Sequence, residues 1–128
     1  MSANHSFDGS LTLAFNVRDR KASVEWYRRF LGCELLYDAA EIGWCEVQAP
    51  IEGGRVTFGF SEVEEPKIGG PVPTLGVVDL DAARAAMEKA DVRFDGDTIV
   101  IPGMVKLATF FDPDGNALML AQSLAVPA

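Results

Sequence analysis

The sequence has 128 residues, 48% of them hydrophobic, with 19 acidic and 11 basic side chains and a formal net charge of −8. This length suits one domain with a conventional core, and the negative charge argues against nucleic acid, whose binding requires neutralisation of phosphates. No run approaches the roughly 18 apolar residues of a membrane span, and the opening MSANHSFDGS lacks the features of a signal peptide. We therefore expect a cytoplasmic protein that binds neither membranes nor nucleic acid.

The first elements follow a polar N-terminal segment, residues 1–9, that we expect to be flexible. The pattern predicts a strand over 11–17 and a helix over 20–31, with Asp19 as its N-cap and Gly32 as a left-handed C-cap. Strands are then predicted at 33–37, 43–48 and 55–61. The order is β, α, β, β, β, which makes a first module of residues 10–61.

A polar segment at 62–70 is predicted to link this module to a second one, residues 71–122, before a tail at 123–128. The second module has a helix predicted over 79–90, with Ala83, Ala86, Met87 and Ala90 facing the core, and strands at 72–78, 92–94, 105–111 and 117–122. The turn signal DPDGN at 112–116 predicts a hairpin between the last two strands.

The two modules also match each other in sequence. Val17-Arg18-Asp19 aligns with Val77-Val78-Asp79, sixty positions later, and the apolar positions of the two helices then coincide. We predict an α+β fold of two tandem βαβββ modules whose curved sheets surround a concave cleft; the alternative is a generic α+β sandwich without a cavity. The cysteines, Cys33 and Cys45, have neither metal-ligand nor redox spacing, and we expect both to be reduced and buried.

Three segments carry a resemblance to a known family. Residues 17–32, VRDRKASVEWYRRFLG, resemble the vicinal-oxygen-chelate pattern V-x-D-x-x-x-S-x-x-(F/W)-Y-x-x-x-L-G, residues 108–120, ATFFDPDGNALML, resemble its final hairpin, and residues 77–83 lie between them at the family's spacing. This superfamily contains glyoxalases, bleomycin resistance proteins and extradiol dioxygenases. The resemblance covers about residues 10–122 and implies the two-module cleft fold and a homodimer.

The metal site of the superfamily has no counterpart in this sequence. Metal-dependent members hold a divalent cation with histidines and glutamates of the first, fourth, fifth and eighth strands, and those positions correspond to Thr12, Gly59, Val72 and Met119. None of the four is a good ligand, and the single histidine, His5, precedes the first strand. We therefore expect no metal and no cofactor.

The alternation of side chains along strands indicates which residues line the cleft. We expect the ligand-binding residues to be Thr12, Asn16, Trp44, Glu46, Thr57, Gly59, Val72, Thr74, Thr109, Phe111 and Met119. Met104 is either a flexible lid or an ordinary core side chain. Trp44 beside Glu46 suits a flat or cationic ligand; alternatively, Trp44 covers a dimer contact and Glu46 is a solvated strand residue.

Two main functions remain open at this point. The first is a metal-independent binding protein of the bleomycin-resistance type, which sequesters a drug, and so confers antibiotic resistance, or a hydrophobic or cationic metabolite. The second is a glyoxalase-like lyase, isomerase or dioxygenase, with Glu46 as a general base of raised pKa or with a metal held by other ligands. A third possibility is a divergent copy that acts mainly through assembly.

Overall fold

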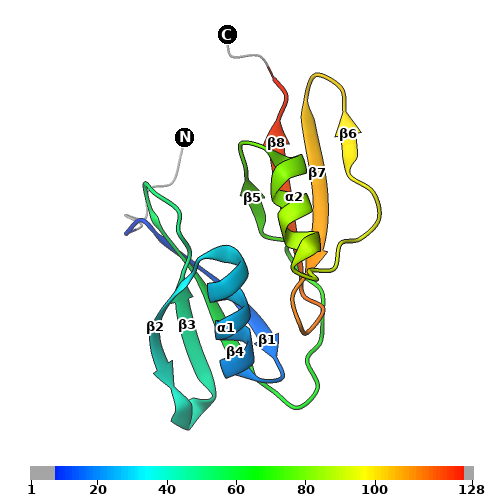
Figure 1. Cartoon of the computed structure of the whole chain (residues 1–128). Coiled ribbons are helices and arrows are strands. Elements are labelled where there is room, and N and C mark those ends of the chain that lie inside the picture. The colour runs from blue at the N-terminus through cyan, green and yellow to red at the C-terminus, as the bar shows by residue number, and fades with distance from the viewer. Residues whose placement is uncertain (1–7, 126–128) are drawn as a thin grey trace. The chain divides into compact units, whose positions relative to one another are not determined.

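The computed structural model describes residues 8–125, which form two helices and eight named strands in two compact units that divide between Lys67 and Ile68. We call residues 8–67 the first half and residues 68–125 the second half (Figure 1). Each half contains one helix and one four-stranded sheet and is described separately. The mixed α+β class and the repeated βαβββ order are confirmed, whereas His5 lies outside the described residues.

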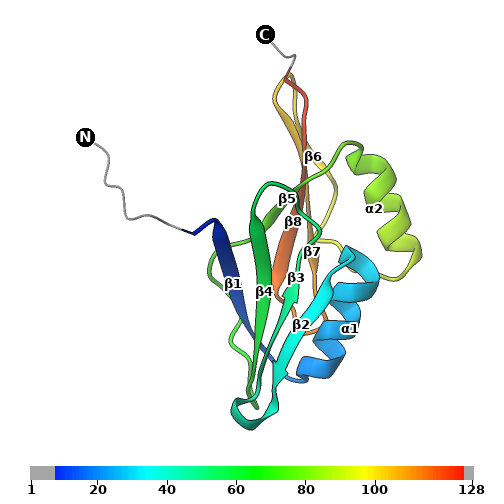
Figure 2. The same ribbon diagram turned by 90° about the vertical axis from the view of Figure 1, so that its left-hand side faces the viewer.

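The sheet of the first half has the strand order β1-β4-β3-β2. The two central strands are antiparallel, and β1 runs parallel to β4. Helix α1 (Arg20–Leu31) lies over one face of this sheet, as Figure 2 shows, and leaves the other face without a helix from this half. The strands are β1 (Ser10–Val17), β2 (Glu34–Ala39), β3 (Trp44–Gln48) and β4 (Arg55–Glu62), and a short 3-10 turn, η1 (Ala40–Ile42), joins β2 to β3.

Helix α1 begins and ends as predicted. The Asp19 carboxylate accepts hydrogen bonds from the backbone N–H groups of Lys21 and Ala22, at 3.1 and 3.2 Å, so it satisfies donors that have no partner within the helix. Gly32 has a φ of 72° and closes the last turn. The buried side of the helix packs on aromatic residues of β4, and the core of this half consists of Val17, Tyr27, Cys33, Cys45, Val47, Ala49, Phe58 and Phe60.

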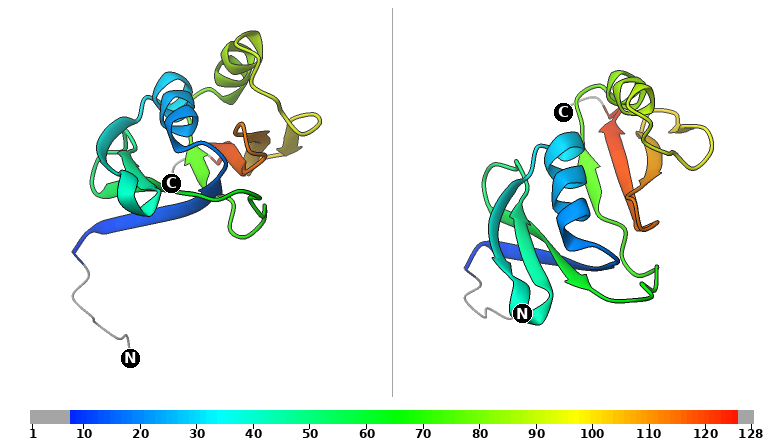
Figure 3. Two further views of the ribbon diagram at one scale, coloured as in Figure 1. Left: turned by 90° about the horizontal axis from the view of Figure 1, so that it is seen from below. Right: turned by 60° about the horizontal axis from the view of Figure 1, so that its bottom comes forward.

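The second half repeats the same topology, with strand order β5-β8-β7-β6 and β5 parallel to β8. Figure 3 shows its helix, α2, beside the sheet. The elements are β5 (Thr74–Gly76), α2 (Leu80–Lys89), β6 (Ile99–Ile101), β7 (Val105–Phe111) and β8 (Ala117–Ser123). The core consists of Leu80, Val92, Ala108, Phe110, Leu118 and Leu120.

Two predicted strands of the second half are wrong in place or extent. The sixth strand is Ile99–Ile101 rather than residues 92–94, where Phe94 forms only an isolated bridge to Phe110. Val92 is 6% exposed, and the centre of the Phe94 ring lies 5.6 Å from that of the Phe110 ring. This segment therefore packs in the core without forming the repeated backbone hydrogen bonds of a strand. Strand β5 is short, and Val72 precedes it.

The predicted buried face of α2 is partly wrong. Leu80 is fully buried, Ala83 and Met87 are half-buried, and Ala86 and Ala90 are exposed. The inner stripe begins at Leu80 and includes Arg84, whose guanidinium lies 4.6 Å from the centre of the Phe94 ring and donates 2.7 Å to the Gly96 carbonyl. The apolar pattern of the helix did not predict that Arg84 faces inward, because it is the aliphatic part of an arginine side chain that covers apolar surface.

The DPDGN segment forms the predicted β7–β8 hairpin. The Asp112 carboxylate accepts from the backbone N–H groups of Asp114 and Asn116, at 3.0 and 2.8 Å, and Gly115 takes a φ of 88°. Both cysteines are free and buried, as predicted. Within residues 8–125, neither helix combines the length and the apolar character that crossing a membrane requires.

Candidate functional site

A hydrogen-bonded network occupies the face of the first sheet opposite α1, with Glu46 at its centre. The Thr57 hydroxyl donates to Glu46 Oε1 at 2.5 Å and the Thr12 hydroxyl donates to the same oxygen at 3.0 Å. The Tyr37 hydroxyl donates to Oε2 at 2.6 Å. The two threonine oxygens also lie 2.8 Å apart. One carboxylate is therefore held by three hydroxyl groups from β1, β2 and β4.

The strand register explains why these side chains meet. Thr12 of β1 pairs with Thr57 of β4, and Glu46 of β3 pairs with Gly59 of β4. Side chains alternate between the two faces along a strand, and β3 shows this alternation, because Cys45 and Val47 are buried against the helix side while its other residues are half-buried. The predicted arrangement of Thr12, Thr57, Glu46 and Trp44 on one face is the observed one.

Trp44 extends the network and lies over a glycine. Its indole Nε1–H donates to the Tyr37 hydroxyl at 2.8 Å, and that hydroxyl in turn donates to Glu46. A Cβ added to Gly59 would overlap Cη2 of the Trp44 ring. The ring therefore fills the space that any side chain at position 59 would need, and the missing side chain of Gly59 allows this close approach.

The surroundings of Glu46 favour its ionised form. Burial raises the pKa of the carboxyl, but the hydrogen bonds from Thr57, Tyr37 and Thr12 and the charge of Arg55 lower it, and the net pKa is below its ordinary value. The hydrogen bond to this carboxylate raises the pKa of Tyr37. Glu46 is consequently ionised at neutral pH and Tyr37 keeps its proton. A general base needs a pKa near the working pH, and this network shifts Glu46 away from that range.

Tyr37 is the member of the network that sequence reasoning missed. Leu35 pairs with Val47, whereas Tyr37 pairs with Glu46, so Leu36 is an extra residue at a bulge in β2. Without the bulge, Tyr37 would share a face with Leu35 on the helix side; the extra residue turns Tyr37 toward Glu46. Strict alternation of side chains along β2 could not reveal this. The bulge is defined only by the pairing of β2 with β3, which the sequence does not show.

Gly59 lies where predicted, beneath the Trp44 ring, and Asn16 lies farther along β1, where it pairs with Ser61. The role of Asn16 in ligand binding stays a prediction.

In the second half, three of the predicted site residues lie side by side. Met119 of β8 pairs with Thr74 of β5 and with Thr109 of β7. Phe111 is two residues beyond Thr109 on the same face of β7, and the Arg93 guanidinium lies 4.9 Å from its ring centre. The pairing of Thr109 with Met119 shows that Thr109 and Phe111 point to the same face of the sheet as Met119.

Two predicted site residues do not belong to this row. Val72 lies before β5 and is 41% exposed. Met104 lies in the turn between β6 and β7 and is 61% exposed, so it is not the core side chain that we considered as one alternative. The other alternative, a flexible lid, stays a prediction.

The residues at the family's metal positions do not fit a divalent cation. Thr12 uses its hydroxyl in the Glu46 network, and Gly59, Val72 and Met119 offer no carboxylate or imidazole. Within residues 8–125, no three His, Cys, Asp or Glu side chains gather closely enough to hold a metal ion.

The sequence matches the model of the Glyoxalase/Bleomycin resistance protein/Dioxygenase superfamily over residues 9–120. No curated protein matches it. Among solved structures, it is similar to TnmS3, an antibiotic binding protein from Streptomyces sp. CB03234, with 24% identity, a TM-score of 0.73, and 94% of this chain and 99% of that one covered.

Two further structures of superfamily members resemble the chain over most of its length. The glyoxalase/bleomycin resistance protein from Catenulispora acidiphila DSM 44928 is 28% identical, with a TM-score of 0.64 and coverage of 92% and 98%. The superfamily member from Sphaerobacter thermophilus DSM 20745 is 22% identical, with a TM-score of 0.71 and coverage of 92% and 98%. By its sequence match and its fold, the chain belongs to the Glyoxalase/Bleomycin resistance protein/Dioxygenase superfamily.

Proposed function

We propose that this protein binds a small cationic organic molecule at the Glu46 network and does not transform it. The observation that carries the proposal is an ionised carboxylate held by three hydroxyl donors on a sheet face without a helix of its own half. Within residues 8–125, no Lys or Arg forms an ion pair with Glu46. Arg55 lies near enough to help lower the pKa of Glu46 but forms no ion pair with it, and a ligand cation would add a direct charge partner.

Trp44 gives the same surface an aromatic component. An ammonium or guanidinium group beside a carboxylate and an indole gains both charge pairing and cation–π attraction. The indole is held by Tyr37 and by its contact with Gly59, so little side-chain entropy is lost when a ligand stacks on it. The overall charge of −8 also favours the approach of cations.

Binding is favoured over catalysis because the pKa of Glu46, the general base that we considered, is lowered and not raised. The lyase, isomerase or dioxygenase alternative needs Glu46 with a raised pKa, or a metal at other ligands, and hydrogen bonding lowers the pKa of Glu46. The similar structure from Streptomyces is an antibiotic binding protein, and this similarity supports the proposal. We propose sequestration of a cationic drug or metabolite as the use of the site.

Fluorescence titration tests this proposal directly. The Trp26→Phe variant leaves Trp44 as the single tryptophan, and we expect bleomycin, a cationic glycopeptide, to change its emission in a saturable way. The Glu46→Gln variant should bind about tenfold more weakly or worse, whereas Glu34→Gln, which changes an exposed carboxylate of β2, should bind normally. Unchanged emission at high ligand concentration, or equal affinity in all variants, would contradict the proposal.

We also propose that the protein is a homodimer. Strand β6 is an edge strand whose Ile99, Val100 and Ile101 are 59%, 51% and 40% exposed. Exposed apolar edge strands are surfaces that a second chain can cover. Light scattering after size-exclusion chromatography should give twice the mass of one chain, and the mass of one chain would contradict this part of the proposal.

A further inference from the structure

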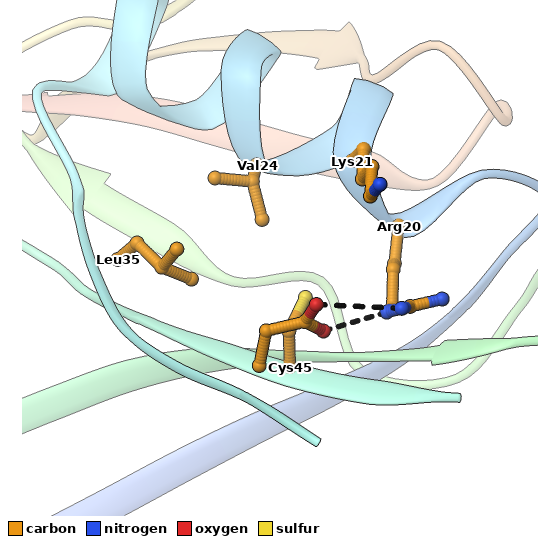
Figure 4. A pocket seen from close by; sticks show the side chains of 6 residues that line it. Arg20, Lys21, Val24, Leu35 and Cys45 are labelled. Carbon is orange, nitrogen blue, oxygen red and sulfur yellow. Dashed lines mark hydrogen bonds and ion pairs between the residues drawn. The ribbon is translucent and has the colours of Figure 1, made fainter. Parts of the chain in front are cut away.

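A pocket of about 190 Å³ lies on the other face of the first sheet, between the first turns of α1 and strands β2 and β3. Figure 4 shows Val24, Leu35 and the Cys45 sulfur around this space, with Arg20 and Lys21 at one side. The lining residues are Arg20, Lys21, Val24, Leu35, Asp38 and Cys45. The pocket is thus lined by side chains of one half alone.

The charged groups at this pocket are already paired or lie at its rim. The Arg20 guanidinium donates to Asp38 at 2.6 and 3.3 Å and to Glu62 at 3.2 Å, and the Arg20 side chain is 12% exposed. This ion-pair cluster forms one wall. Lys21 is exposed and can keep its ammonium group in water. Among the charges that line the pocket, Arg20 and Asp38 are paired with each other, and Lys21, which has no salt bridge within residues 8–125, lies at the rim.

The remaining lining is apolar. Val24 is half-buried, and burial raises the pKa of the Cys45 thiol to about 11, so the thiol is neutral at physiological pH. Leu35 is 51% exposed, which is unusual for a leucine beside a core. A ligand that covered the Leu35 side chain would remove this apolar surface from water.

The bulge in β2 creates this arrangement. Because Leu36 is the extra residue, Leu35 and Asp38 both face the helix side, opposite Val47 and Cys45 respectively, while Tyr37 faces the Glu46 network. The same irregularity therefore shapes two separate surfaces. They lie on opposite faces of the sheet, since Cys45 is flanked in β3 by Trp44 and Glu46.

We propose that this pocket is a second ligand site, which binds an uncharged, largely apolar molecule about the size of one substituted aromatic ring. An apolar cavity of roughly 150 Å³ accommodates benzene, so a pocket of about 190 Å³ has room for one ring with a small substituent. A charged ligand is disfavoured, because Arg20 already has two carboxylate partners, Lys21 keeps its ammonium group in water at the rim, and a charge against Val24 and Cys45 would lose its hydration.

The test is a titration with toluene, followed by the methyl resonances of Val24 and Leu35 in carbon-13 NMR. We expect saturable shifts at these methyl groups and none with benzoate or protonated benzylamine, which have the same ring and opposite charges. Absence of saturable shifts with toluene up to its solubility limit, or equal shifts with the charged analogues, would overturn the proposal.

Two variants locate the site. Leu35→Phe should fill the pocket and weaken toluene binding by about tenfold or more, and because Leu35 is exposed the variant should fold. Leu11→Phe is the matched control, since Leu11 is 57% exposed in β1 of the same sheet and does not line the pocket. Equal weakening by both variants would overturn the assignment.

This inference is independent of the proposed function. Glu46→Gln should weaken bleomycin binding about tenfold or more and leave the toluene shifts unchanged, because the two sites lie on opposite faces of the sheet. If Glu46→Gln also removed toluene binding, the ring would bind at the Glu46 network and the second site would be contradicted.

Discussion

The two halves share one backbone plan and differ in the chemistry of the sheet face opposite their helix. Ala14 pairs with Gly59 in the first half, and Thr74 pairs with Met119 in the second, sixty positions later in both strands. Glu46 pairs with Gly59 as Thr109 pairs with Met119. A carboxylate with three hydroxyl donors in the first half thus corresponds to a threonine beside a methionine in the second.

The two halves therefore share their helix caps and their strand register, and they differ in the side chains on the sheet face opposite the helix. Asp19 and Asp79 cap the two helices in the same way, each accepting from a backbone N–H three residues later, at 3.2 and 3.0 Å. These caps serve folding, and they say little about function. The candidate binding chemistry is confined to positions where the halves differ.

The two cores should differ most in their response to truncation. Tyr27 is fully buried and its ring centre lies 4.6 Å from that of Phe60, whereas Met87 of α2 is half-buried. We expect Tyr27→Ala to lower the free energy of unfolding by about 3–5 kcal/mol and Met87→Ala by about 1 kcal/mol. Urea denaturation followed by circular dichroism measures both, and equal losses would contradict the packing difference described for the two helices.

The second largest expected effect compares Gly59 in the sheet of the first half with Gly76 in the sheet of the second half. Gly59→Ala would force its Cβ into the Trp44 ring, whereas a Cβ at Gly76 in β5 would meet nothing within 4 Å. We expect Gly59→Ala to cost about 1–3 kcal/mol of stability and to shift Trp44 fluorescence, with little effect of Gly76→Ala. Denaturation with fluorescence detection tests this pair. If Gly59→Ala were as stable as the wild type, Trp44 would not lie over Gly59.

Glu46 should contribute a pH-dependent part of the stability. Its pKa in the folded protein is below the ordinary value of 4.5, so its contribution is complete above that pH and is lost as the pH falls through the folded-state pKa. We expect Glu46→Gln to lower the free energy of unfolding by about 1–2 kcal/mol near neutral pH, with a difference that shrinks in acid. A difference that grew in acid would mean a raised pKa and would revive Glu46 as a general base.

The smallest expected effect compares two threonine hydroxyl groups, one from the first strand of each half. Thr12 donates to Glu46, whereas Thr74 in the second half donates 3.2 Å to the Val72 carbonyl. Thr12→Val should cost about 0.5–1 kcal/mol, and Thr74→Val should stay within about 0.5 kcal/mol. Thermal unfolding of the two variants gives the comparison. If Thr74→Val lost more stability than Thr12→Val, polar contacts would matter more on the sheet of the second half than on that of the first.

Much of this architecture could be predicted because it depends on local signals. The helix of the first half follows from Asp19, the apolar spacing and Gly32, and the last hairpin follows from DPDGN. The position of Tyr37 could not be predicted, because it depends on one extra residue in β2 that is defined only by pairing with β3. Strand β6 was missed for a similar reason: it is three residues long and pairs only with β7.

The most direct test of the Glu46 network as a binding site is the nitrogen-15 NMR signal of the tryptophan indoles during a bleomycin titration. Trp44 Nε1–H is hydrogen-bonded to Tyr37, whereas Trp26 lies on α1, on the other side of the sheet. We predict a saturable shift of the Trp44 indole signal that needs at least about tenfold more bleomycin in Glu46→Gln, with the Trp26 signal unchanged. A Trp44 signal that stays fixed, or that shifts equally in Glu46→Gln, would contradict the assignment of this face as the ligand site.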